Sequence, residues 1–333
     1  MHDTRPPFDP ELAGFLETLQ ARGPFRFDPS MLPRMRQLDC SEAELDARLD
    51  ARGLERQERT IPGHLGAPIT VAVIRRSGQA GRTAGTGTAP CFLAMHGGGM
   101  MFGHHLGNLE SYDPLLAHDA VLISVDYRLA PEHPDPTPVE DCYAALVWTA
   151  AHADGLGIDP DRIVLVGQSA GGGLAAGTAL LARDRQGPSV SAQILVSPML
   201  DDRDATVSTQ QIDGVGVADR DFVRTGWTAY LGDRRATDAV SPYAAPARAT
   251  DLRGLPATYI DCGSAEVFRD ETVAFASRLW AAGGDAELHV WPGAFHGFTS
   301  MQPEASISRA AVSALAGWTT RFLERQVAPA PAV

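Results

Sequence analysis

The sequence contains no lysine, so its 28 basic residues are all arginine. The 41 acidic residues outnumber them and set the formal net charge at −13. This acidic balance is unfavourable for contacts with nucleic-acid phosphates or with an anionic membrane surface. We therefore expect no nucleic-acid partner.

Cysteine is also scarce, and its four occurrences, Cys40, Cys91, Cys142 and Cys262, form no Cys-x-x-Cys pair. Such isolated cysteines are expected to be buried free thiols, not disulfides or metal ligands. No apolar run approaches the ~18–20 residues of a membrane span, and residues 1–7 lack the basic and apolar regions of a signal peptide. The sequence thus predicts a cytoplasmic location, no membrane span and no metal.

The first part of the chain has helical patterns and no recognisable strand pattern. Residues 10–17 and 41–49 place apolar residues at helical spacing, and Ser41 with Glu44 fits a capping box. We therefore expect residues 8–60 to be helical.

From residue 69 onward, short apolar runs typical of buried strands alternate with amphipathic segments. This alternation predicts an α/β fold with a mostly parallel sheet covered by helices on both faces. The expected strands are 69–74, 91–95, 121–126, 162–166, 192–197, 257–261 and 287–291, and the expected helices are 138–152, 170–184, 270–282 and 305–325.

Three segments depart from this alternation. Residues 200–250 are rich in Asp, Pro and Ala, which indicates an insertion packed above the sheet. Residues 78–88 are rich in Gly and Thr and predict a mobile loop, and the Ala/Pro tail 327–333 predicts disorder.

The most specific local signal is Gly167-Gln168-Ser169-Ala170-Gly171, which lies between an expected strand and an expected helix. In this context Gly-x-Ser-x-Gly is the pattern of the nucleophile elbow of α/β-hydrolases. The sharp turn exposes the Ser169 hydroxyl, and the following helix directs its N-terminal amides toward an oxyanion.

A second glycine-rich loop, His96-Gly97-Gly98-Gly99, follows the expected strand 91–95. Residues without Cβ atoms allow backbone N–H groups to converge. In the α/β-hydrolase arrangement, this loop supplies oxyanion donors that complement the amide after the nucleophile.

These two motifs, together with Asp126-Tyr127-Arg128-Leu129-Ala130-Pro131-Glu132-His133-Pro134, resemble the hormone-sensitive-lipase family of carboxylesterases, also called bacterial family IV. The resemblance implies an α/β-hydrolase domain, here residues 61–326, with a helical cap drawn from 1–60 and 200–250. It also implies an oxyanion hole formed by the amides of Gly97, Gly98 and Ala170, no cofactor, and a homodimer as a common assembly.

A serine nucleophile needs a histidine base and a carboxylate that orients it, and α/β-hydrolases carry them in the chain order Ser, acid, His. His289 and His296 lie far downstream of Ser169. His289 falls within an expected strand, whereas His296 lies in a glycine-flanked loop that can place the imidazole over the sheet edge. We therefore predict His296 as the base, which matches the His-Gly-Phe position of the family.

The acid is expected in the segment 261–271, which contains Asp261, Glu266 and Asp270 as candidates. By the register of the family's Asp-Pro-Leu-Arg-Asp motif, Glu266 occupies the position of the catalytic aspartate. Asp270 begins the next helix, where an acidic residue is expected, and Asp261 is expected to be a structural group at a strand end. Glu266 is the predicted acid, with the other two left open.

Two residues near the nucleophile differ from the family's commonest pattern and are candidate substrate contacts. Met100 replaces a usual Trp or Phe, which means either a wider pocket or simple core filling. Gln168 replaces a usual Asp or Thr. Among the remaining polar residues, Arg128 and Glu132 are spaced to pair, and His104 and His105 are expected in a surface turn.

The predicted function is hydrolysis of short- to medium-chain carboxylic esters through an acyl-serine intermediate. An amidase, arylformamidase or lactonase on the same scaffold is the main alternative, because leaving-group choice depends on pocket shape. A non-catalytic small-molecule receptor is the second alternative, although the retained His296 disfavours it.

Overall fold

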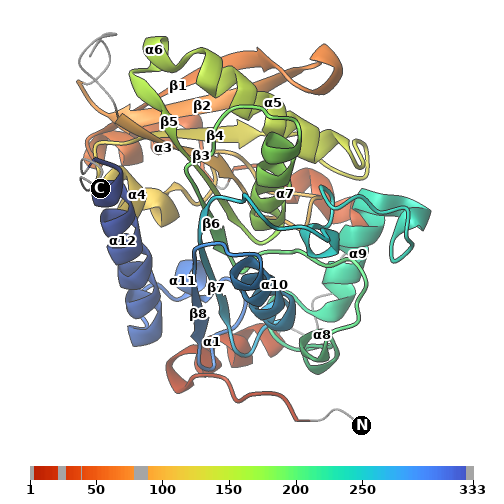
Figure 1. Cartoon of the computed structure of the whole chain (residues 1–333). Helices are drawn as coiled ribbons and strands as arrows, with labels where there is room; N and C mark the ends of the chain where they lie inside the picture. The colour runs from red at the N-terminus through yellow and green to blue at the C-terminus, as the bar shows by residue number, and fades with distance from the viewer. Residues whose placement is uncertain (1–3, 22–27, 39, 79–88, 328–333) are drawn as a thin grey trace.

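The computed structural model describes residues 4–21, 28–38, 40–78 and 89–327. These residues form an eight-stranded sheet with the strand order β1-β2-β4-β3-β5-β6-β7-β8 (Figure 1). The pairs β1/β2 and β2/β4 are antiparallel, and all later pairs are parallel. The strands are β1 Leu54–Pro62, β2 Pro68–Arg76, β3 Ala89–Met95, β4 Val121–Asp126, β5 Ile158–Gln168, β6 Ala192–Val196, β7 Ala257–Gly263 and β8 Ala286–Trp291.

Helices cover both faces of the sheet, as a parallel sheet requires. Residues from α5, α7 and α10 share a hydrophobic cluster with one face, and residues from α3, α4 and α12 share a cluster with the other. These helices are α3 Glu42–Ala51, α4 Asp113–Leu116, α5 Thr137–Ala151, α7 Ala170–Asp184, α10 Arg269–Ala281 and α12 Ser306–Val327. The expected mostly parallel, doubly covered sheet is confirmed.

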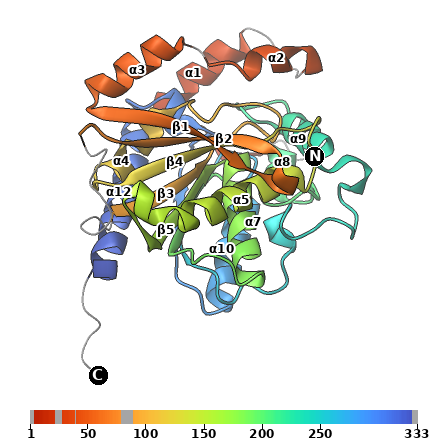
Figure 2. The same ribbon diagram turned by 90° about the horizontal axis from the view of Figure 1, so that it is seen from above.

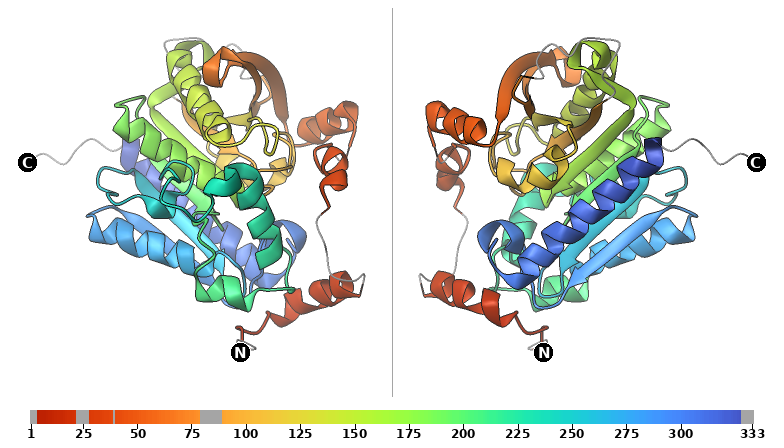
Figure 3. Two further views of the ribbon diagram at one scale, coloured as in Figure 1. Left: turned by 90° about the vertical axis from the view of Figure 1, so that its right-hand side faces the viewer. Right: turned by 90° about the vertical axis from the view of Figure 1, so that its left-hand side faces the viewer.

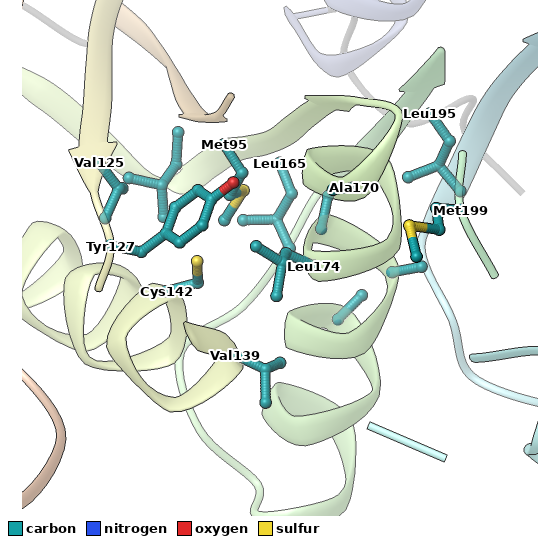
Figure 4. Packing of buried hydrophobic residues seen from close by; sticks show 14 of the residues in the cluster. Met95, Val125, Tyr127, Val139, Cys142, Leu165, Ala170, Leu174, Leu195 and Met199 are labelled. Carbon is teal, nitrogen blue, oxygen red and sulfur yellow. The ribbon is translucent and has the colours of Figure 1, made fainter. Parts of the chain in front are cut away.

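Central strands are apolar throughout because each face of the sheet packs against helices. On β3, Cys91 and Leu93 join one cluster while Phe92 and Ala94 join the other. Figure 4 shows one of these clusters, in which Ala170 at the start of α7 lies beside sheet residues. Of the cysteines, those at 91, 142 and 262 are buried and free, as expected.

The expectation that residues 8–60 lack a strand is wrong at its C-terminal end, because β1 begins at Leu54. β1 is one of the two edge strands of the sheet and pairs only with β2. Its middle is charged and exposed, with burial mainly at Leu54 and Ile61. An edge strand needs little apolar patterning, which explains why the sequence gives no strand signal there.

The N-terminal segment packs along the molecule as a series of short helices. α1 Pro10–Gln20 is followed by a 3₁₀ turn at Pro29–Met31, by α2 Leu32–Met35 and by α3. Figures 2 and 3 show these helices following one another along one side of the molecule. The capping box predicted at Ser41 and Glu44 is present at the start of α3.

The segment 200–250 contains two helices, α8 Val207–Gln211 and α9 Arg220–Leu231. α9 lies directly against the glycine-rich loop, since a Cβ on Gly226 would come within 2.7 Å of the Gly99 carbonyl oxygen. Both this segment and the N-terminal helices remain candidate cap elements. Residues 79–88 of the predicted loop 78–88 and residues 328–333 of the predicted tail 327–333 lie outside the described residues. Within the described chain, no helix combines the length and apolarity needed to cross a membrane.

Candidate active site

The predicted elbow forms a tight turn between β5 and α7, centred on Ser169. Ser169 has φ 58° and ψ −123°, a conformation that L-residues rarely adopt. A Cβ on Gly171 would collide with the Met95 carbonyl oxygen, so only glycine fits beneath the turn. The backbone of Ser169 is fixed on both sides, because its N–H donates to Val196 O and its carbonyl accepts from Met199 N, each at 2.9 Å.

The glycine-rich loop lies next to this turn. A Cβ on Gly97 would be 3.4 Å from the Ser169 Cβ, so the two motifs are in direct contact. Ala170 is the first residue of α7, where an amide has no acceptor in its own helix. The structure therefore places Gly97 and Ala170 next to Ser169, and Gly98 follows Gly97 in the same loop. The role of these three amides as oxyanion donors stays a prediction.

Two side chains bind carbonyl oxygens of the glycine-rich loop and thereby set the direction of the amide that follows each carbonyl. In a trans peptide the C=O of one residue and the N–H of the next point in opposite directions. The Tyr127 hydroxyl donates to the His96 carbonyl at 2.7 Å, which fixes the direction of the Gly97 N–H. His96 Nδ1 lies 2.7 Å from the Gly97 carbonyl, which fixes the Gly98 N–H in the same way.

This contact requires a proton on His96 Nδ1, because a carbonyl can only accept. Burial lowers the pKa of His96 to about 4, so the ring is neutral at ordinary pH. The ring also stacks on Tyr127, with centroids 4.3 Å apart. Tyr127 therefore braces the glycine-rich loop through both a hydrogen bond and ring stacking.

His296 follows β8 in a loop and reaches Ser169 as the sequence predicts. Its Nε2 lies 3.0 Å from Ser169 Oγ, within range for proton transfer. Phe268 packs edge-on to the imidazole, with centroids 5.1 Å apart, and shields it from solvent. His289, the discarded alternative, lies on β8 and contacts Glu287 of the same strand at 3.0 Å.

Glu266 is the carboxylate that contacts the candidate base. Its Oε2 lies 2.6 Å from His296 Nδ1, and the side chain is fully buried. The acid loop and the base loop are joined directly, because Ala265 N donates to Ala294 O at 3.1 Å. The structure therefore aligns Ser169, His296 and Glu266 in one hydrogen-bonded chain.

The two other candidate acids have different partners. Asp270 Oδ2 accepts from Ser208 N at 2.8 Å, and its other oxygen pairs with Arg269. Asp261 accepts from Trp291 Nε1 at 3.1 Å and from the Tyr259 hydroxyl at 3.3 Å. Both are structural contacts, and neither carboxylate has a contact with His296.

Asp261 also predicts a pH dependence of stability. Burial raises its pKa from 3.8 to about 6. Because the pKa of Asp261 is higher in the folded state than in the unfolded state, ionisation of this carboxyl destabilises the fold. Its contribution to the free energy of unfolding is fully present below pH ~4 and is lost as the pH rises through ~6, by up to about 3 kcal/mol. Asp261→Asn removes this penalty and keeps acceptors for Trp291 and Tyr259.

We therefore expect Asp261→Asn to gain stability relative to the wild type between pH ~4 and ~6 and to hold that gain above. Urea unfolding at a series of pH values measures the difference. A stability difference that does not vary with pH would contradict this assignment.

The geometry bears on the remaining expectations near the site. Met100 is fully buried in the hydrophobic core, which favours core filling over a wider pocket. Gln168 is half-buried at the end of β5, and its contact with substrate stays a prediction. The turn expected at residues 104–105 is present at His105, but the expected exposure is wrong, because the His105 side chain is buried with its Nδ1 3.3 Å from Asp126 Oδ1.

The expected pair between Arg128 and Glu132 is also wrong. Arg128 binds the buried Asp141 at 2.8 Å, whereas Glu132 binds Arg36 at 2.7 Å. Residues four apart meet on a helix, but this segment is an irregular loop.

Sequence reasoning missed Phe222 on α9. A Cβ on Gly99 would lie 3.1 Å from the Phe222 ring, and Phe222 packs against Phe102 with centroids 5.8 Å apart. The Phe222 ring, which belongs to the 200–250 segment, therefore covers the glycine-rich loop. No local motif marks this residue, because the contact joins segments that are more than 100 positions apart.

A separate groove of about 420 Å³ lies between α2, the residues just after the glycine-rich loop and α9, and Ser169 is not among its lining residues. Its lining combines Leu32, Met101 and Pro131 with one face of α9.

Across the described residues, no group of His, Cys, Asp and Glu side chains is arranged to hold a metal ion.

Comparison with known proteins agrees with this architecture. A family model described as the alpha/beta hydrolase fold matches residues 92–300, which is more than half of the chain and contains every candidate site residue. The chain belongs to this α/β-hydrolase family. The resemblance to hormone-sensitive-lipase-type esterases expected from the motifs is thereby confirmed.

Named relatives and solved structures of the α/β-hydrolase family are similar over large parts of the chain. "Carboxylesterase NlhH" of Mycobacterium tuberculosis is 37% identical over 219 residues, which span 63% of this chain and 67% of that protein. The structure named "Bacterial Heroin Esterase" superposes with a TM-score of 0.81 at 37% identity and covers 95% of this chain and 98% of its own. Esterase LipW from Mycobacterium marinum has a TM-score of 0.77 at 31% identity and covers 97% and 99% of the two chains.

Proposed function

We propose that this α/β-hydrolase is a serine carboxylesterase that cleaves short- to medium-chain esters of small molecules. The observation that carries the proposal is the contact chain from Ser169 Oγ to His296 Nε2 at 3.0 Å and from His296 Nδ1 to Glu266 Oε2 at 2.6 Å. The names of its relatives support the same reaction class.

The first half of the reaction forms an acyl-serine. Ser169 Oγ attacks the ester carbonyl while His296 Nε2 takes its proton, and the Glu266 carboxylate stabilises the imidazolium at Nδ1. The negative charge that develops on the carbonyl oxygen is stabilised by the backbone amides of Gly97, Gly98 and Ala170. One such donor typically contributes ~3 kcal/mol to the transition state.

The second half regenerates the enzyme. His296 gives its proton to the leaving alkoxide, and the alcohol departs. A water molecule then attacks the acyl-serine while His296 again accepts a proton, and the carboxylic acid is released with Ser169 restored. Protein side chains, backbone amides and one water molecule are sufficient for these steps.

The surroundings of the serine favour a small substrate. Ser169 is only 8% exposed, and Phe222 packs against Gly99 of the glycine-rich loop. An acyl or alkyl group of modest size suits such an enclosed and partly aromatic site. Formation of a homodimer and a cytoplasmic location stay predictions from the sequence.

Comparison of esters with amides tests the proposal. We expect p-nitrophenyl esters with acyl chains of about two to eight carbons to be hydrolysed, and the matching p-nitroanilides to react at least ~100-fold more slowly, because the aniline is the poorer leaving group. Initial rates with purified protein give kcat/KM for each compound. Faster cleavage of anilides or lactones would favour the amidase or lactonase alternative, and absence of all turnover would favour a receptor.

A further inference from the structure

Arg36, at the end of α2, connects the N-terminal segment to the glycine-rich loop. Its Nε donates to the Met101 carbonyl at 2.8 Å, and its Nη2 donates to the Ala130 carbonyl at 2.9 Å. Both terminal nitrogens also bind the carboxylate of Glu132, at 2.9 and 2.7 Å. One guanidinium therefore joins three segments that are distant in the sequence.

The Met101 carbonyl belongs to a peptide unit that holds the glycine-rich loop. The N–H on the other side of that unit, from Phe102, donates to the Gly98 carbonyl at 3.1 Å. The preceding amide, from Met101, donates to the same oxygen at 3.0 Å. Because carbonyl and N–H oppose one another across each peptide plane, Arg36 orients the Phe102 amide toward Gly98.

The direction of the Gly98 carbonyl matters for the oxyanion hole. Gly98 has φ +123°, a conformation that is adopted mainly by glycine. Because glycine has no Cβ to restrict them, the peptide units on either side of Gly98 can rotate unless hydrogen bonds hold them. The peptide unit between Gly98 and Gly99 shares the Gly98 Cα with the unit that carries the Gly98 amide, so a rotation that moves this Cα would also move the amide. The two hydrogen bonds to the Gly98 carbonyl prevent this rotation.

We propose that Arg36 is a positioning residue for the oxyanion hole, so that docking of the segment 29–36 is required for full activity. This inference rests on the proposed ester hydrolysis, because it concerns the stabilisation of an oxyanion. Arg36 does not touch the reacting atoms. It acts through the Met101 and Phe102 backbone, and its loss is expected to weaken transition-state binding more than substrate binding.

An arginine is needed at this position for geometric reasons. Its planar fork offers donors in fixed directions to a carboxylate and to carbonyls at the same time, whereas a lysine ammonium is a point charge. Arg36 also holds the pKa of Glu132 at about 2, so that the pair stays charged at every pH at which esters are normally assayed.

The test compares Arg36→Ala and Arg36→Lys with Arg34→Ala. Arg34 is an exposed arginine on the same helix, α2, and serves as the matched control. We expect both Arg36 variants to lose about tenfold or more in kcat with KM changed less than ~3-fold, because only a transition-state contact is weakened. Arg34→Ala is expected to match the wild type.

The second readout is inhibition by a trifluoromethyl ketone, which adds to the serine and places an oxyanion in the hole. We expect its Ki to rise in both Arg36 variants in proportion to the fall in kcat/KM. A merely structural role of Arg36 would lower the melting temperature without this proportional change. Arg36→Lys retains a positive charge beside Glu132, and it serves as the folded variant if Arg36→Ala is unstable.

Wild-type kcat and Ki in Arg36→Ala, or full recovery of both in Arg36→Lys, would overturn the inference. A wild-type protein that neither hydrolyses esters nor binds the ketone would instead overturn the proposed function, and the inference with it. The two failures are distinguishable because the first requires an active wild-type enzyme.

Discussion

Ser169→Ala is expected to abolish ester hydrolysis, with kcat reduced by about 10⁴-fold or more. The substitution removes the nucleophile and leaves His296 without a proton to accept. Steady-state hydrolysis of p-nitrophenyl butyrate measures the loss. Ala also fits the elbow without new contacts, although the positive φ of 58° at this position strains any residue with a Cβ.

The residual activity of this variant is informative as well. The amides of the oxyanion hole remain in place and still stabilise the transition state for attack by water, so a rate above the uncatalysed reaction is expected. A circular dichroism spectrum equal to that of the wild type serves as the control for folding. Turnover within about tenfold of the wild type would exclude Ser169 as the nucleophile.

Glu266→Gln is expected to lower kcat by about 10³- to 10⁴-fold. The amide is nearly the same size as the carboxylate but carries no charge, so it cannot stabilise the imidazolium. It also lets His296 adopt the wrong tautomer, because an amide N–H can donate to Nδ1. The pocket around Glu266 is closed, with the side chain fully buried, so water cannot readily replace the lost carboxylate.

Two neighbouring carboxylates provide matched controls for this substitution. Asp261→Asn and Asp270→Asn each remove one negative charge from the same segment, and each is expected to keep kcat within ~3-fold of the wild type. Their contacts lie with Trp291, Tyr259, Ser208 and Arg269, away from the imidazole. A large loss in either control combined with a small loss in Glu266→Gln would reassign the acid.

The residues of the hydrogen-bonded chain were predictable because their signals are local. Gly167 and Gly171 are required by the close packing of the elbow, and the strand and helix around them mark the turn. His296 follows from chain order and from its place in a loop. Glu266 needed the family register, since three carboxylates within ten positions cannot be separated by spacing alone.

Other features depend on contacts that leave no local trace. β1 is a charged edge strand, so the hydrophobic pattern that reveals the central strands is absent from it. Phe222 and Arg36 reach the glycine-rich loop from segments far away in the chain, and Arg36 in particular contacts residues 65 to 96 positions away. Only the folded structure brings them together.

Labelling with a fluorophosphonate tests the central claim most directly, because the reagent phosphonylates only a serine that is activated by a neighbouring base. The account predicts a mass increase of one phosphonyl group per chain, located by peptide mapping at Ser169. It also predicts that labelling is lost in Ser169→Ala and in His296→Ala and is strongly slowed in Glu266→Gln. A label on another residue, or an ester-hydrolysing protein that takes up no label, would contradict it.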